Sequence, residues 1–556
     1  MASWQELAAS HRNKRDAAIP REWVLPQDRL SQLSGAGTDG EGRLILLESI
    51  RRSGLLTDEE FAITEHHNAT SLLRKISGNV LSSEAVTVAF CKRAALAQQL
   101  TSCLTEVFFQ EAIDRAKWLD QYLQDNKTAV GPLHGLPISL KASDSFQVKG
   151  HHATLGYTAS VSRQPSVENS ALVQLLLDAG AVLYCKTNIP QTLMTADSEN
   201  NIFGRTLNPH KTSLTAGGSS GGEGALVASR GSPLGVGTDI AGSIRIPSLC
   251  CGTYGFKPTS SRVPYGNQVP APFTKMRFPG GITPCAGPLA NSMEDLDLFM
   301  STVIGKRPWK YDPTALDIDW RKIDFGHTKK LTVGVLAEDP EYPLMPPVKR
   351  ALDEAVALLV QAGHNIVFLP ADEASSPGLG GRLAGQFYGL APSGYESKEE
   401  VTGEPKVKSV ALGVHPYGKA GFPVDPELDL AHRVDSLAIA RDDFARAWQH
   451  HWCDRDLDVV VAPGCNTTAV PYDTYGVPVY TMMWNLLDYP AGIIPFGKSS
   501  KAMDPNPRQA EGQFEADYNP DAWDGAPCAI QIIAPRFRDE ECLAAMRIID
   551  KDLNKS

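Results

Sequence analysis

The 556-residue sequence has no run of about 18 consecutive apolar residues, so we expect no transmembrane helix. It has no excess of positive charge either: the formal net charge of −11 argues against nucleic acid and anionic membrane surfaces as partners. The N-terminal segment is charged and lacks the apolar region of a secretory signal, and the final residues, DLNKS, form no retention or peroxisomal tripeptide. We therefore expect a cytoplasmic protein.

Cysteine and histidine are too sparse for a disulfide scaffold or a zinc site. The ten cysteines include no Cys-x-x-Cys pair, and the adjacent Cys250 and Cys251 lie in an apolar context. None of the 13 histidines is spaced from another ligand type in the way that metal ligands are. We predict reduced, buried thiols and no metal site.

The apolar pattern is typical of an α/β protein. Residues 168–188 read as a helix, a glycine turn and a strand, and the near-continuous apolar run 457–462 suits a strand in a sheet covered on both faces. Residues 1–80 are polar, with helical fragments typical of an amphipathic arm. The same patterns predict further strands at 137–140, 234–237, 331–336, 366–369 and 529–534, and further helices from 82 or 83 onward and at 111–125, 223–228, 346–363 and 539–553.

Two glycine-rich turns each carry a serine. The first, GGSSGG, contains Ser219, and the second, TDIAGSIR, contains Ser243. Glycine permits tight turns and close approach of a ligand, and small residues before a serine let several backbone N–H groups point at one spot. The first turn alone is read equally well as a flexible loop or a weak phosphate cradle, although it lacks the Gly-Lys-Ser/Thr ending of a P-loop.

Lys141 follows a short apolar run that is typical of a β-strand. A lysine at a strand end is by default a solvated surface charge, but the small and apolar residues before Lys141 favour burial. A serine nucleophile needs a base within hydrogen-bond reach. No histidine lies in residues 217–259, and no Gly-x-Ser-x-Gly motif is centred on Ser243, so a Ser-His-Asp triad would need a distant partner.

Residues 217–259 resemble the signature of the amidase signature family of serine hydrolases along nearly their whole length. The segment ending in Lys141 resembles the Gly-x-Pro-x-x-x-Lys element of that family, residues 185–188 its Gly-Lys-Thr-Asn element, and residues 525–543 its C-terminal pattern. Two departures stand out. Ala241 replaces a glycine that is usual in the family, and the loop after Lys141 has two extra residues within 142–146.

This resemblance implies the amidase signature fold, an α/β fold whose large central, mixed and twisted β-sheet is covered by helices on both faces. It implies one catalytic domain over residues 81–556, preceded by a helical arm, residues 1–80, packed on the core. The Gly-, Pro- and Ser-rich segment 371–426 has no clear period, and we expect it to line or cover the substrate entrance. Residues 498–525 are expected to form a surface insertion.

The resemblance also implies a Ser-Ser-Lys triad, with Ser243 as the nucleophile, Ser219 as the bridging residue and Lys141 as the base. Burial lowers the pKa of a lysine from about 10.4 by up to ~3–5 units, which lets a buried lysine act as a base. No cofactor is needed. The implied oxyanion hole consists of the N–H groups of Ile240, Ala241, Gly242 and Ser243. The implied substrate-binding residues are Leu193, Met194 and Ser219, although Leu193 and Met194 are read equally well as ordinary core.

We therefore expect an amidohydrolase that cleaves a carboxylic acid amide to an acid and ammonia or an amine through an acyl-serine intermediate. The whole-chain pattern resembles fungal acetamidase-type and fatty-acid-amide-hydrolase-like members. The open alternatives are an ester or carbamate hydrolase, an acyltransferase of a biosynthetic pathway, a glutamine-amidotransferase subunit and an inactive binding relative. The expected partner is a small-molecule amide, and the oligomeric state stays open, with a homodimer as one option.

Overall fold

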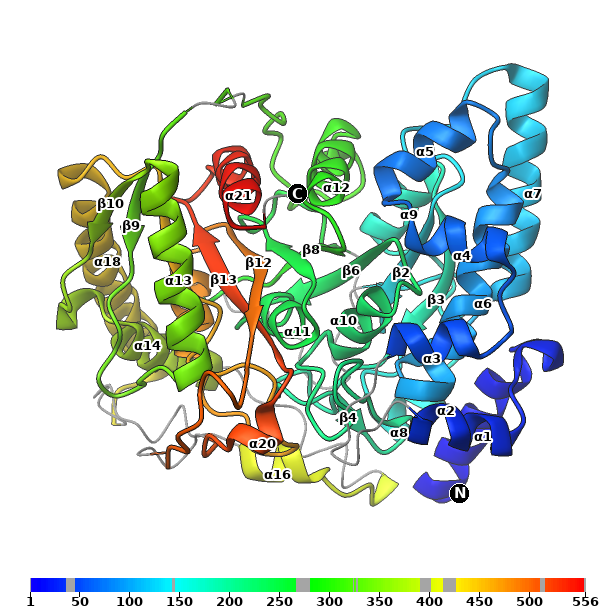
Figure 1. The fold of residues 1–556 in the computed structure, drawn as a ribbon, viewed down its shortest axis with the longest axis horizontal. Helices are drawn as coiled ribbons and strands as arrows, with labels where there is room; N and C mark the ends of the chain where they lie inside the picture. The colour runs from blue at the N-terminus through cyan, green and yellow to red at the C-terminus, as the bar shows by residue number, and fades with distance from the viewer. Residues whose placement is uncertain are drawn as a thin grey trace.

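A sheet of 11 strands runs through the centre of the molecule (Figure 1). The computed structural model describes residues 2–36, 46–142, 146–266, 281–323, 325–326, 329–390, 402–413, 427–510 and 516–554. In spatial order the strands are β1 (Leu104–Val107), β3 (Val182–Thr187), β2 (Pro137–Lys141), β6 (Leu234–Asp239), β8 (Cys285–Ala290), β7 (Tyr254–Lys257), β12 (Ala491–Lys498), β13 (Pro527–Ile533), β11 (Val459–Pro463), β9 (Thr332–Val335) and β10 (Asn365–Phe368). A separate hairpin pairs β4 (Glu199–Asn200) with β5 (Gly204–Arg205).

The sheet is mixed. Strands β3, β2 and β6 are parallel neighbours, as are β11, β9 and β10, whereas the strands between these two groups pair antiparallel. Every residue of β2, β3, β6 and β11 is buried, as expected for strands covered on both faces. The prediction of an α/β fold with a large mixed sheet is confirmed.

Helices cover the sheet on both sides. Near β9 and β10, Figure 1 shows α13 in front of the sheet and α14 and α18 behind it. The larger helices are α6 (Ser83–Thr101), α7 (Phe109–Asn126), α9 (Ala171–Asp178), α10 (Gly221–Ala228), α11 (Arg245–Cys251), α12 (Met293–Gly305), α13 (Pro346–Ala362), α14 (Pro377–Gly389), α18 (Leu430–Asp454), α19 (Val479–Leu486) and α21 (Asp539–Asn554). The short ones are α8 (Thr158–Val161), α16 (Lys408–Gly413) and α20 (Pro520–Trp523).

The N-terminal helices pack at the β1 end of the sheet. They are α1 (Trp4–Ala17), α2 (Gln27–Ala36), α3 (Leu46–Arg52), α4 (Asp58–Glu65) and α5 (Ala69–Ser77). In α1, Arg12 donates a hydrogen bond to the Ile202 carbonyl (2.6 Å) and Arg15 donates one to the Leu104 carbonyl (3.0 Å). The helical character of this region agrees with the sequence, and its division from a catalytic domain at residue 81 stays a prediction.

Residues 371–426, which show no clear period in the sequence, contain a regular helix. Within residues 371–426, α14 carries Gly378, Gly380 and Gly381 in its first turns. A Cβ atom on Gly380 would lie 2.7 Å from the Cβ atom of Met483, and one on Gly381 would lie 2.5 Å from Val479. Close packing of α14 on α19 therefore outweighs the low helix propensity of glycine. Residues 391–401 and 414–426 lie outside the described residues.

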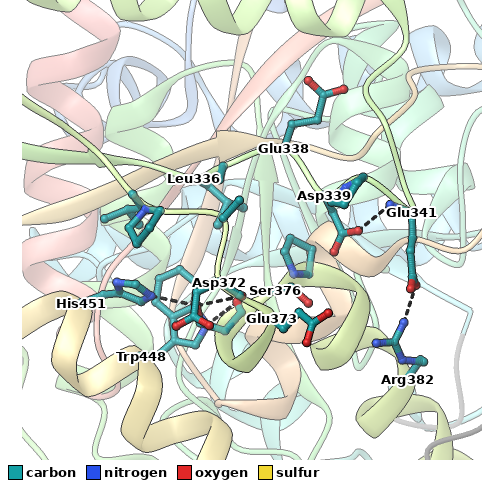
Figure 2. A pocket seen from close by; sticks show the side chains of 17 residues that line it. Leu336, Glu338, Asp339, Glu341, Asp372, Glu373, Ser376, Arg382, Trp448 and His451 are labelled. Carbon is teal, nitrogen blue, oxygen red and sulfur yellow. Dashed lines mark hydrogen bonds and ion pairs between the residues drawn. The ribbon is translucent and has the colours of Figure 1, made fainter.

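A crevice opens beyond the carboxyl ends of the parallel strands β9 and β10 (Figure 2). It has a volume of about 140 Å³ and is lined by residues 336–341 after β9, by residues 369–377 after β10, and by side chains of α14 and α18. Its polar groups bond to one another: Asp339 accepts a hydrogen bond from the Gly378 N–H (2.6 Å), and the His451 ring lies 2.8 Å from Ser375 Oγ. None of its lining residues belongs to the two serine turns.

All ten cysteines lie in the described chain as free thiols, and nine of them are buried; Cys453 is exposed. This agrees with the prediction of reduced thiols. No helix in the described ranges combines the length and apolar character that a membrane span requires.

Candidate active site

Lys141 is the last residue of β2, between two parallel neighbours. Thr187 of β3 is its register partner on one side, and the preceding residue pairs with β6 on the other. Its side chain is completely buried, and Nζ donates hydrogen bonds to Ser219 Oγ (2.7 Å) and to Thr238 Oγ1 (2.8 Å). The lysine is therefore held in the interior beside a serine hydroxyl, not in solvent.

Ser219 lies in the turn that leads into α10. The preceding Gly217 has φ +79°, and a Cβ atom there would lie 2.9 Å from the backbone of Pro247. A Cβ atom on Gly218 would lie 2.2 Å from the Thr195 carbonyl oxygen, so only glycine fits at this position. The Gly218–Ser219 peptide bond is cis. These close approaches explain why the sequence is so rich in glycine at this turn.

Ser243 lies in the second turn, which is joined to the first. The Ser220 N–H donates to the Ser243 carbonyl oxygen (3.2 Å), and the Ser220 hydroxyl lies 3.4 Å from the Thr238 backbone. Ser243 is 7% exposed, compared with 2% for Ser219. The structure thus brings Lys141, Ser219 and Ser243 into one buried region from three separate segments of the chain.

Asp239 braces the turn that carries Ser243. Its carboxylate accepts hydrogen bonds from the backbone N–H groups of Gly242 (2.9 Å) and Ile244 (3.1 Å), and from the Arg245 guanidinium (3.0 and 3.1 Å). Burial raises the pKa of this carboxyl group, but the Arg245 charge and the hydrogen bonds from Arg245 and Asn485 outweigh that effect and hold the pKa well below its usual range. Asp239 is therefore a fixed anion that braces the turn.

The backbone of this turn is also fixed from the opposite side. Thr481 Oγ1 donates to the Ala241 carbonyl (2.6 Å), and the Tyr388 hydroxyl donates to the Ile240 carbonyl (2.5 Å). Gly242 has φ +125°, and a Cβ atom there would lie 2.3 Å from Thr481 Oγ1. Ala241 stands one position before this closely packed glycine and fits with its methyl group partly buried.

The four N–H groups predicted to form an oxyanion hole differ in their partners. The Gly242 N–H donates to Asp239 Oδ1, so it is already engaged. Among the residues that the structure describes, no acceptor is recorded for the N–H groups of Ile240, Ala241 and Ser243. These three groups stay the candidates for binding an oxyanion.

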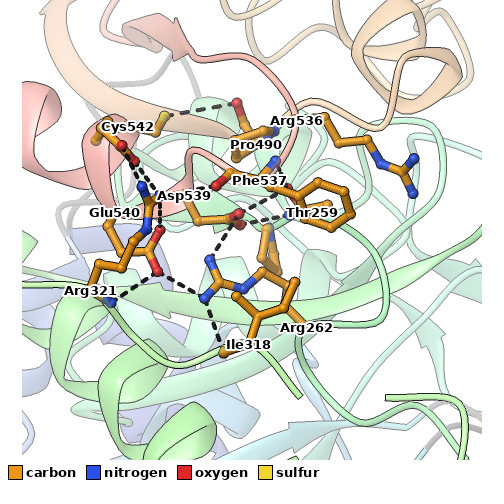
Figure 3. Close-up of polar contacts among 12 residues, drawn as sticks. Thr259, Arg262, Ile318, Arg321, Pro490, Arg536, Phe537, Asp539, Glu540 and Cys542 are labelled. Atoms are coloured by element: carbon orange, nitrogen blue, oxygen red, sulfur yellow. Dashed lines mark hydrogen bonds and ion pairs between the residues drawn. The ribbon is translucent and has the colours of Figure 1, made fainter. Parts of the chain in front are cut away.

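The end of the glycine-rich stretch is anchored to the C-terminal helix (Figure 3). The Thr259 N–H and hydroxyl donate to the two carboxylate oxygens of Asp539 (2.7 and 2.8 Å). Arg262 bonds to both Asp539 (3.2 Å) and Glu540 (2.8 Å), and Arg321 bonds to Glu540 on its other side (2.6 Å). Two segments that resemble the family, residues 217–259 and 525–543, are therefore in contact.

Comparisons with known proteins show the family and the fold. A family model described as Amidase matches residues 85–378 and 422–543. An amidase of Gibberella moniliformis is 40% identical over 549 residues, covering 98% of both chains, and an acetamidase of Emericella nidulans is 34% identical over 569 residues, covering 99% of this chain and 98% of that one. A solved structure of fatty acid amide hydrolase superposes with a TM-score of 0.87 at 30% identity, covering 99% of this chain and 95% of that chain.

The chain belongs to the amidase family. It is an amide-hydrolysing enzyme with the fold of the amidase signature enzymes, and the family acts on small amide substrates. The resemblance stated from the sequence is confirmed.

Leu193 and Met194, the predicted substrate-binding residues of this amidase, are not ordinary core. Met194 is 36% exposed, and Leu193 is half-buried with φ +62°. Their loop continues to Thr195, whose carbonyl oxygen lies against Gly218 beside Ser219. The loop is thus next to the serine turn, and contact of these two side chains with a substrate stays a prediction.

Glu404 lies in residues 402–413, a described part of the segment 371–426 that is predicted to line or cover the substrate entrance, and it binds this loop. The Glu404 side chain is buried and accepts hydrogen bonds from the Thr158 N–H (2.7 Å), from Gln191 Nε2 (3.1 Å) and from Asn201 Nδ2 (3.1 Å). The Val407 N–H donates back to Gln191 Oε1 (3.0 Å). Residues 402–413 are thereby tied to the segment that leads to Leu193.

Sequence reasoning missed the polar residues that surround Lys141. Glu223, interpreted only as the start of a helix, is completely buried and lies 2.6 Å from Ser139 Oγ and 2.9 Å from Thr187 Oγ1. One signal was available: Ser139 precedes Lys141 by two residues, so on a strand both side chains point to the same face. A buried lysine on that face requires polar neighbours, and Glu223 of α10 is one of them.

Within the described ranges, no group of three or more His, Cys, Asp and Glu side chains is arranged to hold a metal ion.

Proposed function

We propose that this amidase cleaves a carboxylic acid amide through an acyl-serine intermediate, with Ser243 as the nucleophile, Ser219 as the proton relay and Lys141 as the base. The single observation that carries the proposal is the 2.7 Å hydrogen bond between the buried Lys141 amine and Ser219 Oγ, in a turn bonded to the turn of Ser243. Burial disfavours the charged form of an amine, which suits Lys141 to accept a proton.

The first half of the reaction forms the acyl enzyme. Lys141 takes the proton of Ser219, which takes the proton of Ser243, and the Ser243 oxygen attacks the amide carbon. The negative charge that develops on the amide oxygen is stabilised by the N–H groups of Ile240, Ala241 and Ser243. The C–N bond then breaks as the leaving nitrogen receives the proton back through Ser219.

The second half releases the acid. A water molecule attacks the acyl carbon, its proton passes by the same relay to Lys141, and the bond from the carbon to the Ser243 oxygen breaks as that oxygen regains a proton. Every proton that leaves the serine returns to a product or to the serine. The scheme therefore needs no metal ion or organic cofactor as a reactant.

The substrate is proposed to be a carboxylic acid amide that releases ammonia or an amine. Relatives named acetamidase and fatty acid amide hydrolase support this class. The accessible Met194 and the half-buried Leu193 beside the Ser219 turn offer an apolar surface to the acyl group.

Labelling with a fluorophosphonate probe tests the nucleophile. We expect the wild-type protein to be labelled and Ser243→Ala to remain unlabelled. Ser248→Ala is the matched control, because Ser248 is a buried serine nearby whose hydroxyl bonds only to the Ile244 carbonyl of its own helix among recorded contacts (2.9 Å), and it should be labelled normally. Labelling that persists in folded Ser243→Ala would show that Ser243 is not the nucleophile.

A further inference from the structure

Glu223 is a buried carboxyl group beside Lys141 to which the proposed reaction gives no part. It lies in the first turn of α10, a helix that packs on β6, β2 and β3, and its side chain has no exposure to solvent. A Cβ atom on Gly235 of β6 would lie 2.2 Å from Glu223 Oε2, so the strand approaches the carboxyl group as closely as glycine permits.

A chain of hydroxyl groups fixes the proton on Glu223. Glu223 Oε2 lies 2.6 Å from Ser139 Oγ, which lies 2.9 Å from Ser232 Oγ, which lies 2.9 Å from the Leu234 carbonyl oxygen. A carbonyl oxygen only accepts, so Ser232 must donate its one proton to Leu234. Ser139 must then donate to Ser232, and the contact between Glu223 and Ser139 is a hydrogen bond only if Glu223 donates. All three contacts are hydrogen bonds when Glu223 is a neutral carboxylic acid.

The same carboxyl group is joined to the strands that hold Lys141. Ser139 is two residues before Lys141 on β2 and on the same face, and Thr187, which donates to Glu223 Oε1 (2.9 Å), is the register partner of Lys141 on β3. The charge of Lys141 acts on Glu223, so the two groups influence each other.

The other titratable groups coupled to Glu223 in the described chain stay uncharged. Burial raises the pKa of Cys103 to about 12, and it raises the pKa of the Cys185 thiol and of the Tyr184 hydroxyl well above their usual values. Lys141 is therefore the group facing Glu223 whose charge matters for catalysis.

We propose that Glu223 is a positioning residue for amide hydrolysis: held as a neutral acid, it joins β2 and β3 behind Lys141 and keeps negative charge away from the amine, so that Lys141 remains a free base. This inference rests on the proposed function. Burial raises the pKa of Glu223 to about 8, an effect that the hydrogen bond from Thr187 and the charge of Lys141 only partly offset. Ionisation of Glu223 would stabilise the ammonium form of Lys141 and so reduce the active fraction.

Glu223→Gln is the decisive variant, because glutamine is neutral at every pH and can still donate to Ser139 and accept from Thr187. Because Glu223 is proposed to be neutral while Lys141 loses its proton, the neutral glutamine should leave the midpoint of the rising acid limb of the kcat/KM profile in place. A limb that moves toward acid by about one pH unit, the scale of a strong coupling between two sites, would show that a Glu223 carboxylate stands beside Lys141 in the wild type and would overturn the inference.

Infrared difference spectra of the wild type against Glu223→Gln give a second readout that needs no turnover. At pH 7 we expect the carbonyl band of a neutral carboxylic acid in the wild type and its loss in the variant. A carboxylate band in its place contradicts the inference. If Glu223→Gln fails to fold, Thr187→Val serves: it removes a hydrogen bond that favours the ionised form, so the band of the neutral carboxylic acid should persist to higher pH than in the wild type.

Asp295→Asn is the matched control. Asp295 is another buried carboxyl group, but it accepts hydrogen bonds from the N–H groups of Ala69 (3.0 Å) and Thr70 (2.9 Å) in α5 and not from β2 or β3. Its replacement should cost stability and leave the acid limb in place. Failure of the inference and failure of the proposed function are distinguishable, because loss of fluorophosphonate labelling in Ser243→Ala identifies the nucleophile whatever the charge of Glu223.

Discussion

Two buried pairs of acidic and basic side chains flank the serine turns, and they are built in opposite ways. Asp239 and Arg245 are in contact, with a nitrogen–oxygen distance of 3.0 Å, and the pKa of Asp239 is held well below its usual range. Glu223 shares its hydrogen bonds with the neutral hydroxyl groups of Ser139 and Thr187, and burial raises its pKa to about 8. Equal burial thus yields a permanent ion pair in one place and a neutral acid in the other.

The difference follows from the donors that each carboxyl group meets. A guanidinium and two backbone N–H groups compensate a carboxylate, whereas hydroxyl groups offset its desolvation only in part. The first pair suits a brace that must not change during the reaction. The second suits a site where a lysine has to lose and regain a proton.

The largest expected effect comes from breaking the ion pair. Arg245→Met leaves the Asp239 charge buried without its partner and also removes the donor to Gln531 Oε1 (2.8 Å). We expect a loss of roughly 3–5 kcal/mol in the free energy of unfolding, measured by urea denaturation at pH 7. A variant as stable as the wild type would show that the pair does not brace the turn.

The same substitution at the other cation should act differently. Lys141→Met removes a buried amine and replaces it with an apolar side chain of similar length, so the free energy of unfolding should stay within about 1.5 kcal/mol of the wild type or rise. The kcat/KM value should fall by about 10²–10⁴, the usual contribution of a general base. Retained turnover in Lys141→Met would exclude Lys141 as the base, whatever its effect on stability.

A third prediction compares stability across pH. The pKa of Glu223, about 8 in the folded state, lies above the ordinary 4.5, so its contribution to stability is fully present below about pH 4.5 and is lost as pH rises to about 8. Relative to the wild type, Glu223→Gln should therefore gain a few kcal/mol in the free energy of unfolding between those limits. Parallel stability curves for the two proteins would mean that Glu223 is already ionised when folded.

The smallest effect is expected from Thr481, which bonds to the turn that carries Ser243. Thr481→Val removes the hydroxyl that donates to the Ala241 carbonyl (2.6 Å) but keeps the side-chain shape. Loss of one such hydrogen bond costs about 1 kcal/mol, so we expect a comparable loss of stability and a drop in kcat of about tenfold or less. A drop as large as that of Lys141→Met would show that this hydroxyl takes part in the chemistry itself.

Much of the site could be predicted because local sequence determines it. The apolar run before Lys141 places the lysine at a strand end, and the glycines around Ser219 and Ser243 reflect close backbone approaches. The alternation and length of the apolar runs gave the α/β class and most element positions. Each of these features depends on neighbours within a few residues.

The remainder depends on packing between distant segments. Nothing local marks Glu223 as buried, because its partners Ser139 and Thr187 come from two strands earlier in the chain. The helix α14 was missed because its glycines serve contact with α19 and not helix propensity. The engagement of the Gly242 N–H by Asp239 likewise appears only once the turn is folded.

Trapping the acyl enzyme tests the central claim most directly. The protein would be mixed with a slowly deacylating amide or carbamate, quenched within one turnover, digested and analysed by peptide mass spectrometry. The account predicts the mass of the acyl group on the peptide that contains Ser243, and its absence in Ser243→Ala. Turnover with no acyl group on any peptide, or with the group on another side chain, would contradict it.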